Sequence, residues 1–215
     1  MSANNIFRFT GDLLHAASHG ILIEKIRSSG SCTGISLKTQ LLYGIVFSSR
    51  YFDLLWNFGS LYNTILKIYY LATTFYTIYL IAFKHADTYE QQLDKLPLWT
   101  IVVPSVLFSL IFTKKYRVFE IFWTFSLIIE SMTLLPQFLM LQKSSSIQSF
   151  SQSYVVVLGL YRAFYILNWI YRAIKGVNVG FVVWTTGIIQ VAMFSEFFYY
   201  WIKAKLQGEQ MQLPK

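Results

Sequence analysis

Seven apolar stretches divide this chain, and each approaches the roughly 20 residues that a helix needs to cross a bilayer. They fall near residues 5–26, 39–57, 60–83, 98–113, 117–141, 153–175 and 178–204. Hydrophobic residues make up 55% of the chain, only 13% of residues are charged and the mean hydropathy is +0.47, which excludes a water-soluble domain of this length. The sequence therefore predicts an all-α integral membrane protein with seven transmembrane helices.

Six ionisable side chains stand out inside these apolar stretches. They are Arg50, Asp53, Glu120, Glu130, Arg162 and Glu196. A charge at the bilayer centre costs about 2.5–3.5 kcal/mol, so six unpaired charges would cost roughly 15–20 kcal/mol, more than the ~5–15 kcal/mol by which a domain is usually stable. We therefore expect them to pair with one another or to line a wet cavity. Their mixed signs suit a ligand that itself carries both charges.

Several classes of protein are disfavoured. The net charge is +8, but the basic residues flank the apolar stretches and form no polar basic stripe. We therefore expect membrane lipid and not nucleic acid as a partner. Cys32 alone forms no internal disulfide or thiolate metal site, and the three histidines lack ligand-spaced companions, so we expect no metal. Catalytic motifs are missing, and Glu120 and Glu130 lie about 15 Å apart along one helix, too far for an acid–base pair.

Arg8, Asp12, His15 and His19 interrupt the first apolar stretch, and no small-residue cleavage pattern comes after it, so we interpret it as a retained helix and not a signal peptide. The four residues share one helical face, which must point into the bundle. Two interpretations stay open: a fixed ion pair between Arg8 and Asp12 beside two packed histidines, or a site in which His15 titrates near neutral pH.

Two further patterns point to a charged site. Tyr161, Tyr165, Trp169 and Arg172 form a stripe along one helix, either as core and interfacial anchors or as the mouth of an anion site. Arg50 and Asp53 are three residues apart, close enough to pair with each other. Glu130 could bind Tyr161 or Arg162 across helices, as a structural network or as a switch.

Basic residues are unequally distributed between the two sides of the predicted bundle. One side holds Lys25, Arg27, Lys38, Lys84, Lys95, Lys143, Lys203, Lys205 and Lys215. The other side holds Lys114, Lys115, Arg117, Arg172 and Lys175. The positive-inside rule therefore predicts a cytosolic C-terminus and a lumenal or external N-terminus.

A shift of 112 residues aligns Arg50 with Arg162 and Gln40 with Gln152, together with three apolar pairs. We interpret this as a weak internal repeat within a single membrane domain, residues 1–215. Its parts are two three-helix halves, 5–83 and 117–204, a linker helix at 98–113 that carries Pro104, and a cytosolic tail at 205–215. This is the plan of transporters with parallel repeats.

Motifs along nearly the whole chain resemble one family. They are NNIFRFTGDLLH at 4–15, SCTGISLKTQ at 31–40, RYFDL at 50–54, SLYNT at 60–64, EIFWTFSLIIES at 120–131, LLPQ at 134–137, LYRAFYILNWIYR at 160–172 and FFYYW at 197–201. The chain is thereby similar to the ER lumen protein retaining receptors, the KDEL or HDEL receptor family. The resemblance implies a fold like that of SWEET and PQ-loop proteins, and a receptor that cycles between Golgi and endoplasmic reticulum membranes.

The resemblance also implies the ligand and the residues that hold it. The ligand is the C-terminal Lys/His-Asp-Glu-Leu signal of lumenal proteins, which a receptor recognises as an address. The implied ligand-binding residues are Arg50 for the terminal carboxylate, Arg8 for the Glu, Arg172 for the Asp, Asp53 and Glu120 for the Lys or His, and Trp123, Tyr165 and Trp169 along the path. The implied residues for pH sensing and switching are His15, Glu130, Tyr161, Arg162 and Glu196, and those of the coat-protein signal are Lys203 and Lys205.

Three features depart from the family pattern. Glu196 stands where the family usually has Asp. A loop predicted to be lumenal is unusually basic, because it holds Lys114, Lys115 and Arg117. The tail has few lysines. We expect no cofactor beyond the proton, which acts as a regulator. The competing hypotheses are a proton-linked carrier of a small solute and a purely structural membrane protein.

Overall fold

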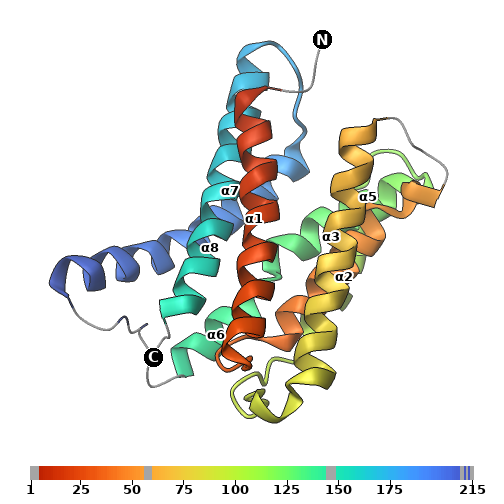
Figure 1. Cartoon of the computed structure of the whole chain (residues 1–215). Helices are drawn as coiled ribbons and strands as arrows, with labels where there is room; N and C mark the ends of the chain where they lie inside the picture. Colours follow the sequence, from red (N-terminus) through yellow and green to blue (C-terminus); the bar gives the residue numbers. More distant parts are fainter. Residues whose placement is uncertain (1–4, 56–59, 144–148, 209–210, 212, 214–215) are drawn as a thin grey trace.

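The computed structural model describes residues 5–55, 60–143, 149–208, 211 and 213. All regular structure in these ranges is helical (Figure 1). The α-helices are α1 (Ile6–Ser29), α2 (Leu37–Arg50), α3 (Leu61–Tyr79), α4 (Trp99–Phe112), α5 (Val118–Met132), α6 (Leu135–Lys143), α7 (Ser149–Ile174) and α8 (Phe181–Gln207). Three short elements complete the set: 3-10 turns at Phe52–Leu55 and Ala86–Thr88 and a π-turn at Leu80–Lys84.

Four spans in the described part are long and apolar enough to cross a membrane. They are Leu61–Lys84, Val118–Lys143, Gln152–Ile174 and Phe181–Gln207. Helix α4 is apolar but shorter, whereas α1 and α2 do not meet the same standard of length and composition, since α1 carries a charged stripe and α2 has 14 residues. Because α5 and α6 lie in one span, seven helical segments result, and the prediction of an all-α membrane protein is confirmed.

Two predicted boundaries are wrong. The second helix was expected to run to residue 57 but ends at Arg50, and the chain tightens into the turn Phe52–Leu55. The stretch 117–141 was expected as one helix but breaks between Met132 and Leu135. Pro136 explains the break, because it has no N–H to donate and its ring crowds the carbonyl four residues earlier.

Local sequence sets the ends of the first two helices. The Asn5 side chain accepts from the Arg8 amide (3.0 Å) and caps the start of α1. Helix α1 ends at Ser29 and is capped by Gly30, whose φ of 64° lies in the left-handed region that glycine adopts without strain. The Ser36 side chain accepts from the Thr39 amide (3.0 Å) and begins α2.

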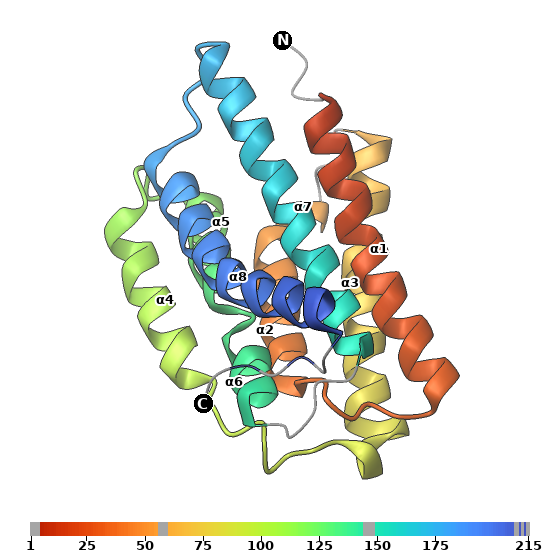
Figure 2. The same cartoon turned by 90° about the vertical axis from the view of Figure 1, so that its left-hand side faces the viewer.

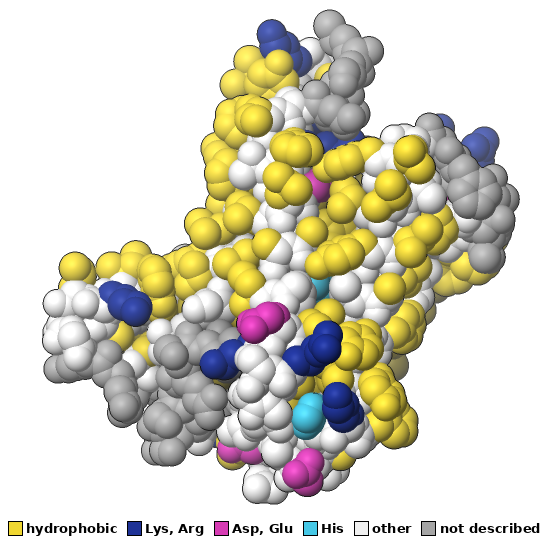
Figure 3. Space-filling model, in the orientation of Figure 1, with side chains coloured by type: hydrophobic (Ala, Val, Ile, Leu, Met, Phe, Trp, Pro, Cys, Tyr) yellow, Lys and Arg dark blue, Asp and Glu magenta, His cyan; other side chains and the backbone are white. Residues whose placement is uncertain are grey.

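The bundle is built on α1, which packs along α7 and against α3. Helix α2 packs between α3 and α5, α4 covers α5, and α8 contacts α5 and α7 before its C-terminal part projects away from the bundle (Figures 1 and 2). The end at the top of Figure 1, which we call the upper end, holds the start of α1, the start of α3 and the end of α7. Apolar side chains cover much of the outer face over α1 and α3, while charged side chains gather toward its lower end (Figure 3).

A buried polar cluster joins the loops at the lower end to α2 and α6. The Asp94 carboxylate accepts from the Ser36 hydroxyl (2.9 Å) and the Tyr89 hydroxyl (2.7 Å). Gln137 accepts from the Ser36 amide (2.9 Å) and donates to the Gly34 carbonyl (2.8 Å). Nearby, burial raises the pKa of the Cys32 thiol, so the thiol stays protonated at neutral pH.

Candidate functional site: a charged cavity near the upper end

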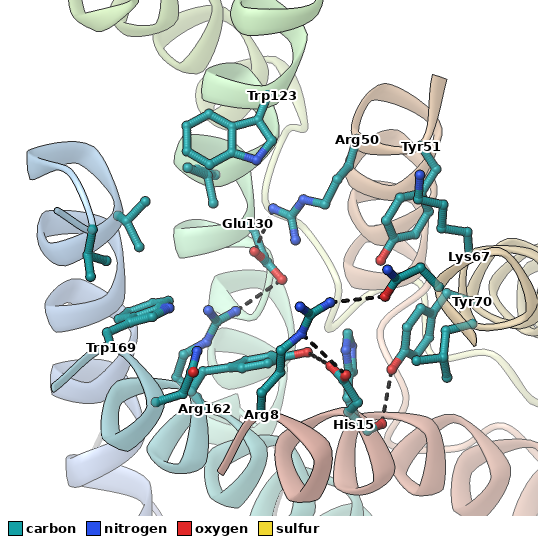
Figure 4. A pocket seen from close by; sticks show the side chains of 18 of the residues that line it. Arg8, His15, Arg50, Tyr51, Lys67, Tyr70, Trp123, Glu130, Arg162 and Trp169 are labelled. Carbon is teal, nitrogen blue, oxygen red and sulfur yellow. Dashed lines mark hydrogen bonds and ion pairs between the residues drawn. The ribbon is translucent and has the colours of Figure 1, made fainter. Parts of the chain in front are cut away.

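A cavity of about 830 Å³ opens among α1, α2, α3, α5, α7 and the start of α8 (Figure 4). Its charged lining consists of five cationic side chains, Arg8, Arg50, Lys67, Arg162 and Arg172, and two carboxylates, Asp12 and Glu130. Its aromatic lining consists of Tyr51, Tyr70, Trp123, Tyr165 and Trp169. The volume lies within the usual range for small-ligand sites, and the excess of cations favours an anionic ligand.

Glu130 is the centre of a buried ion network. Its carboxylate accepts from Arg50 Nη2 at 2.7 Å and pairs with Arg162 Nη2 at 3.0 Å (Figure 4). Arg50 also donates from Nε to the Ser126 hydroxyl (3.0 Å), and Arg162 donates to the Tyr161 hydroxyl (3.0 Å). Glu130 and Arg162 are 3% and 4% exposed, so one carboxylate holds α2, α5 and α7 together at a point that is nearly closed to water.

A second carboxylate, Asp12 on α1, collects hydroxyl donors. Tyr62 donates to it at 2.9 Å, Tyr165 donates to its other oxygen, and the Arg8 guanidinium lies 3.7 Å away. Arg8 is held more closely by the Asn63 side-chain oxygen, at 3.0 Å. The pair of Arg8 and Asp12 expected from their spacing is therefore present, but it is long, and Arg8 keeps much of its capacity to bind an anion.

The predicted polar face of the first helix does point into the bundle. The His15 ring stacks between Tyr161 (centroids 4.1 Å apart) and Tyr70 (4.5 Å), and it lines the cavity. His19 lies deeper, with its ring centroid 5.3 Å from that of His15, and it is not part of the cavity wall. His15 Nε2 is buried and has no hydrogen-bond partner among the described residues.

Two glycines allow the aromatic walls to approach the helices. A Cβ on Gly187 of α8 would lie 2.3 Å from the Trp169 ring, so that ring rests directly on the α8 backbone. A Cβ on Gly11 would lie 3.3 Å from the Tyr165 ring. Trp184 meets Trp169 edge to face at 6.0 Å, which fixes the position of the cavity wall near α8.

The predicted pair of Arg50 and Asp53 is wrong. Helix α2 ends at Arg50, so Asp53 sits in the turn after it and binds Lys67 of α3 instead, at 2.7 and 2.8 Å. Lys67 lines the cavity but was not predicted, because one lysine hardly lowers the mean hydropathy of the stretch 60–83. A search of that stretch for single charges would have found it.

The structure brings most of the predicted site residues together. Those that line the cavity are Arg8, His15, Arg50, Trp123, Glu130, Arg162, Tyr165, Trp169 and Arg172. Tyr161 lies behind the wall, against His15 and Arg162, and Asp53 reaches the cavity through Lys67. Lys203 and Lys205 are exposed in the last turns of α8.

Asp53, Glu120 and Glu196 do not line the cavity, and in the described part of the chain none of them pairs with another of the six charges, so the expectation that all six pair with one another or line it is wrong for these three. Glu120 is exposed in the first turn of α5, where the helix dipole favours a carboxylate. Glu196 is exposed on α8 and borders a separate hollow of about 120 Å³ with Phe138 and Leu213. The course of α8 away from the bundle places Glu196 there.

The fold and the cavity define a class: a helical membrane protein with a ligand-sized, positively charged cavity near one end. The family model of the ER lumen protein retaining receptor matches residues 31–172. Relatives named ER lumen protein-retaining receptor are 44% identical in Entamoeba histolytica, covering 98% of this chain and 99% of the relative, and 41% identical in Dictyostelium discoideum, covering 98% and 100%. The human ER lumen protein-retaining receptor 2 is 41% identical and covers 98% and 99%.

The chain belongs to the ER lumen protein retaining receptor family. Together with the apolar spans, this makes it a multi-pass membrane protein of the secretory pathway. The family is one of receptors, and its name describes no catalysis.

We expect Glu130→Gln to destabilise the protein strongly, because it leaves the buried Arg162 and the partly buried Arg50 without a counter-charge. Removing one partner of a buried ion pair costs about 3–5 kcal/mol. The measurement is the midpoint of thermal unfolding in detergent, with Glu120→Gln on the same helix as the control, because Glu120 is exposed. Equal midpoints for the two variants would show that the network around Glu130 adds nothing to stability.

Proposed function

We propose that this protein binds the C-terminal Lys/His-Asp-Glu-Leu signal of lumenal proteins in the Golgi and returns those proteins to the endoplasmic reticulum. The observation that carries the proposal is the lining of the cavity, where five cations face two carboxylates. The signal offers three negative groups, Asp, Glu and the terminal carboxylate, and one positive group. A ligand with that balance supplies the anions that the cavity lacks.

The state of each arginine supports a division of roles. Arg50 uses Nε and Nη2 for Ser126 and Glu130, and its Nη1 makes no hydrogen bond to a described residue. It therefore keeps donors for the terminal carboxylate. Arg8, with its long contact to Asp12, would take the Glu, and Arg172, which has no ion pair in the described part of the chain, would take the Asp.

The cation of the ligand requires an acidic partner at the same site. Asp53 is not part of the cavity wall, but its carboxylate accepts from Lys67, which is. We propose that the Lys or His of the signal shares Asp53 with Lys67, while Glu120 acts from the first turn of α5, outside the cavity lining. When the ligand binds Arg50, Glu130 changes its hydrogen bonds. In the ligand-bound, closed state of the receptor, Tyr161 donates a hydrogen bond to Glu130.

We expect Arg50→Ala to abolish most binding of a peptide that ends in Lys-Asp-Glu-Leu, and amidation of the peptide C-terminus to do the same to the unchanged receptor. Losing one partner of a buried charge pair typically costs about 2–5 kcal/mol. Both affinities are measured by calorimetry, with Glu196→Gln as a control variant outside the cavity lining. Because both changes remove the same contact, their losses of binding free energy should not add. Additive losses would show that Arg50 does not meet the terminal carboxylate.

Uptake of a small solute with no peptide binding would favour the carrier hypothesis.

We propose that His15 makes binding depend on pH. Tyr161 and Tyr70 face its ring, and the cations Arg50 and Arg162 in the same cavity oppose another positive charge. An anionic ligand offsets that opposition, so ligand and proton favour each other's binding, and affinity should rise as pH falls through the range where histidine titrates.

The expected change is at most tenfold per pH unit between about pH 7.4 and 6, because a single proton supplies no more. His15→Phe keeps the stack with Tyr161 and Tyr70 and should flatten the profile, whereas His19→Phe, the matched control, should leave it unchanged. Peptide affinity measured across the pH range decides the matter. A flat profile in the unchanged protein, or an unaltered profile in His15→Phe, contradicts the role of His15.

We propose that Lys203 and Lys205 form the signal that vesicle coat proteins bind for the return journey. Both are exposed at the end of α8, and a purely topological role needs only charge. Replacing both by Arg should leave peptide binding intact and trap the receptor in the Golgi, as seen by microscopy after cargo expression. The control replaces Lys84 and Lys95 by Arg, which should return normally. Normal return of the Lys203→Arg, Lys205→Arg variant rules out the coat signal.

A further inference from the structure

Four exposed cations lie on the two links that join helices near the upper end. Lys114, Lys115 and Arg117 lie between α4 and α5, and Lys175 comes directly after the end of α7. We call these four residues the basic rim. None of them forms an ion pair with a carboxylate in the described part of the chain. Their positive charge is therefore available to a partner.

The basic rim borders the cavity. Arg117 precedes α5, and Trp123, six residues further along, lines the cavity, which places the two about 9 Å apart along the helix axis. On the other wall, Arg172 lines the cavity and Lys175 lies within one turn of it. The two links lie close together, since the rings of Phe112 and Phe181 at their ends are 6.3 Å apart (Figure 2).

The charge balance at this place is strongly one-sided. Glu120 is the carboxylate on the α5 side of the rim, and it lies one turn nearer the cavity than Arg117. The positive-inside rule works against basic residues on the side predicted to be lumenal, so orienting the helices does not account for them. A binding role does account for exposed cations beside a cavity that have no carboxylate partner in the described part of the chain.

We infer that the basic rim binds acidic residues of the cargo protein that lie a few positions upstream of the four residues held in the cavity. The inference rests on the proposed function and extends it from a tetrapeptide to a longer acidic peptide. An extended chain advances about 3.3 Å per residue, so the 9 Å from Trp123 to Arg117 corresponds to about three residues. Acidic residues from roughly the third position upstream onward would meet the rim.

The rim contributes modestly at each contact. An exposed ion pair changes affinity by about 1.5- to 5-fold, and at about twofold per contact, near the lower end of that range, three or four contacts together give about tenfold. This contribution should fall as salt rises, because the charges are exposed to solvent and screened over about 8–10 Å at 0.1–0.15 M salt.

The test uses three peptides that all end in Lys-Asp-Glu-Leu and differ only in the preceding six residues, which are acidic, glutamine-rich or lysine-rich. Binding is measured by fluorescence anisotropy on the full chain in uncharged detergent at low and high salt. The unchanged protein should bind the acidic peptide about tenfold more tightly than the glutamine peptide, and the lysine peptide most weakly. The difference should shrink at high salt.

Neutralising the rim should remove this preference and nothing else. The triple variant Lys114→Gln, Lys115→Gln, Arg117→Gln should bind the acidic and glutamine peptides within about twofold of each other, with the glutamine peptide bound as before. Lys175→Gln should reduce the preference by a smaller factor. The matched control, Arg27→Gln, Lys84→Gln, Lys95→Gln, removes the same charge from exposed positions at the lower end and should keep the full preference.

The outcomes separate the two proposals. If none of the peptides binds, the proposed function fails. If all three bind equally well, the proposed function stands and the basic rim has no role in selecting cargo. If the lower-end control loses the preference as well, the effect is overall net charge and the inference is wrong. If the triple variant alters binding to vesicles of anionic lipid but not to the peptides, the rim is a lipid site and the inference is again wrong.

Discussion

Glu130 carries one negative charge between two guanidinium groups, the buried one of Arg162 and the partly buried one of Arg50. The carboxylate oxygens of Glu130 both have partners, but the charges do not cancel. The three helices therefore meet at a site that retains one excess positive charge. An excess charge inside a membrane protein is costly. An anion bound in the adjoining cavity lowers that cost, so the interaction that holds α2, α5 and α7 together also creates the demand for a ligand. We propose that stability and ligand binding depend on the same atoms.

The two arginines at Glu130 are the pair that a shift of 112 residues aligns. We propose that the chain consists of two related halves whose equivalent arginines converge on one carboxylate contributed by α5. Their meeting supports that proposal. The halves differ in the residues beyond each arginine, since α2 ends at Arg50, whereas α7 continues for three turns past Arg162 and carries Tyr165, Trp169 and Arg172. Only the second half has this extension, and the extension forms the part of the cavity wall that α7 contributes.

Periodicity within one helix was sufficient to predict which faces are buried. Asp12, His15 and His19 share a face and are 6%, 3% and 4% exposed. Periodicity did not predict partners across helices, because it carries no information on which helices pack or where they end. Arg50 binds a carboxylate 80 positions away because α2 stops before Asp53. Likewise, a charge in an apolar stretch is buried only if its face meets another helix, and the inclination of α8 leaves Glu196 exposed.

Cys32 is the single cysteine of the chain, and its side chain is 0% exposed and donates to the His85 carbonyl (3.1 Å) at the lower end. A thiol that is buried and protonated reacts slowly with alkylating reagents. A cysteine introduced at an exposed position such as Lys175 or Lys203 would therefore react with a thiol-specific probe faster than Cys32. Cys32 would not have to be replaced. Two such positions, one at the mouth of the cavity and one on α8, would report the distance between them while ligand and pH are varied.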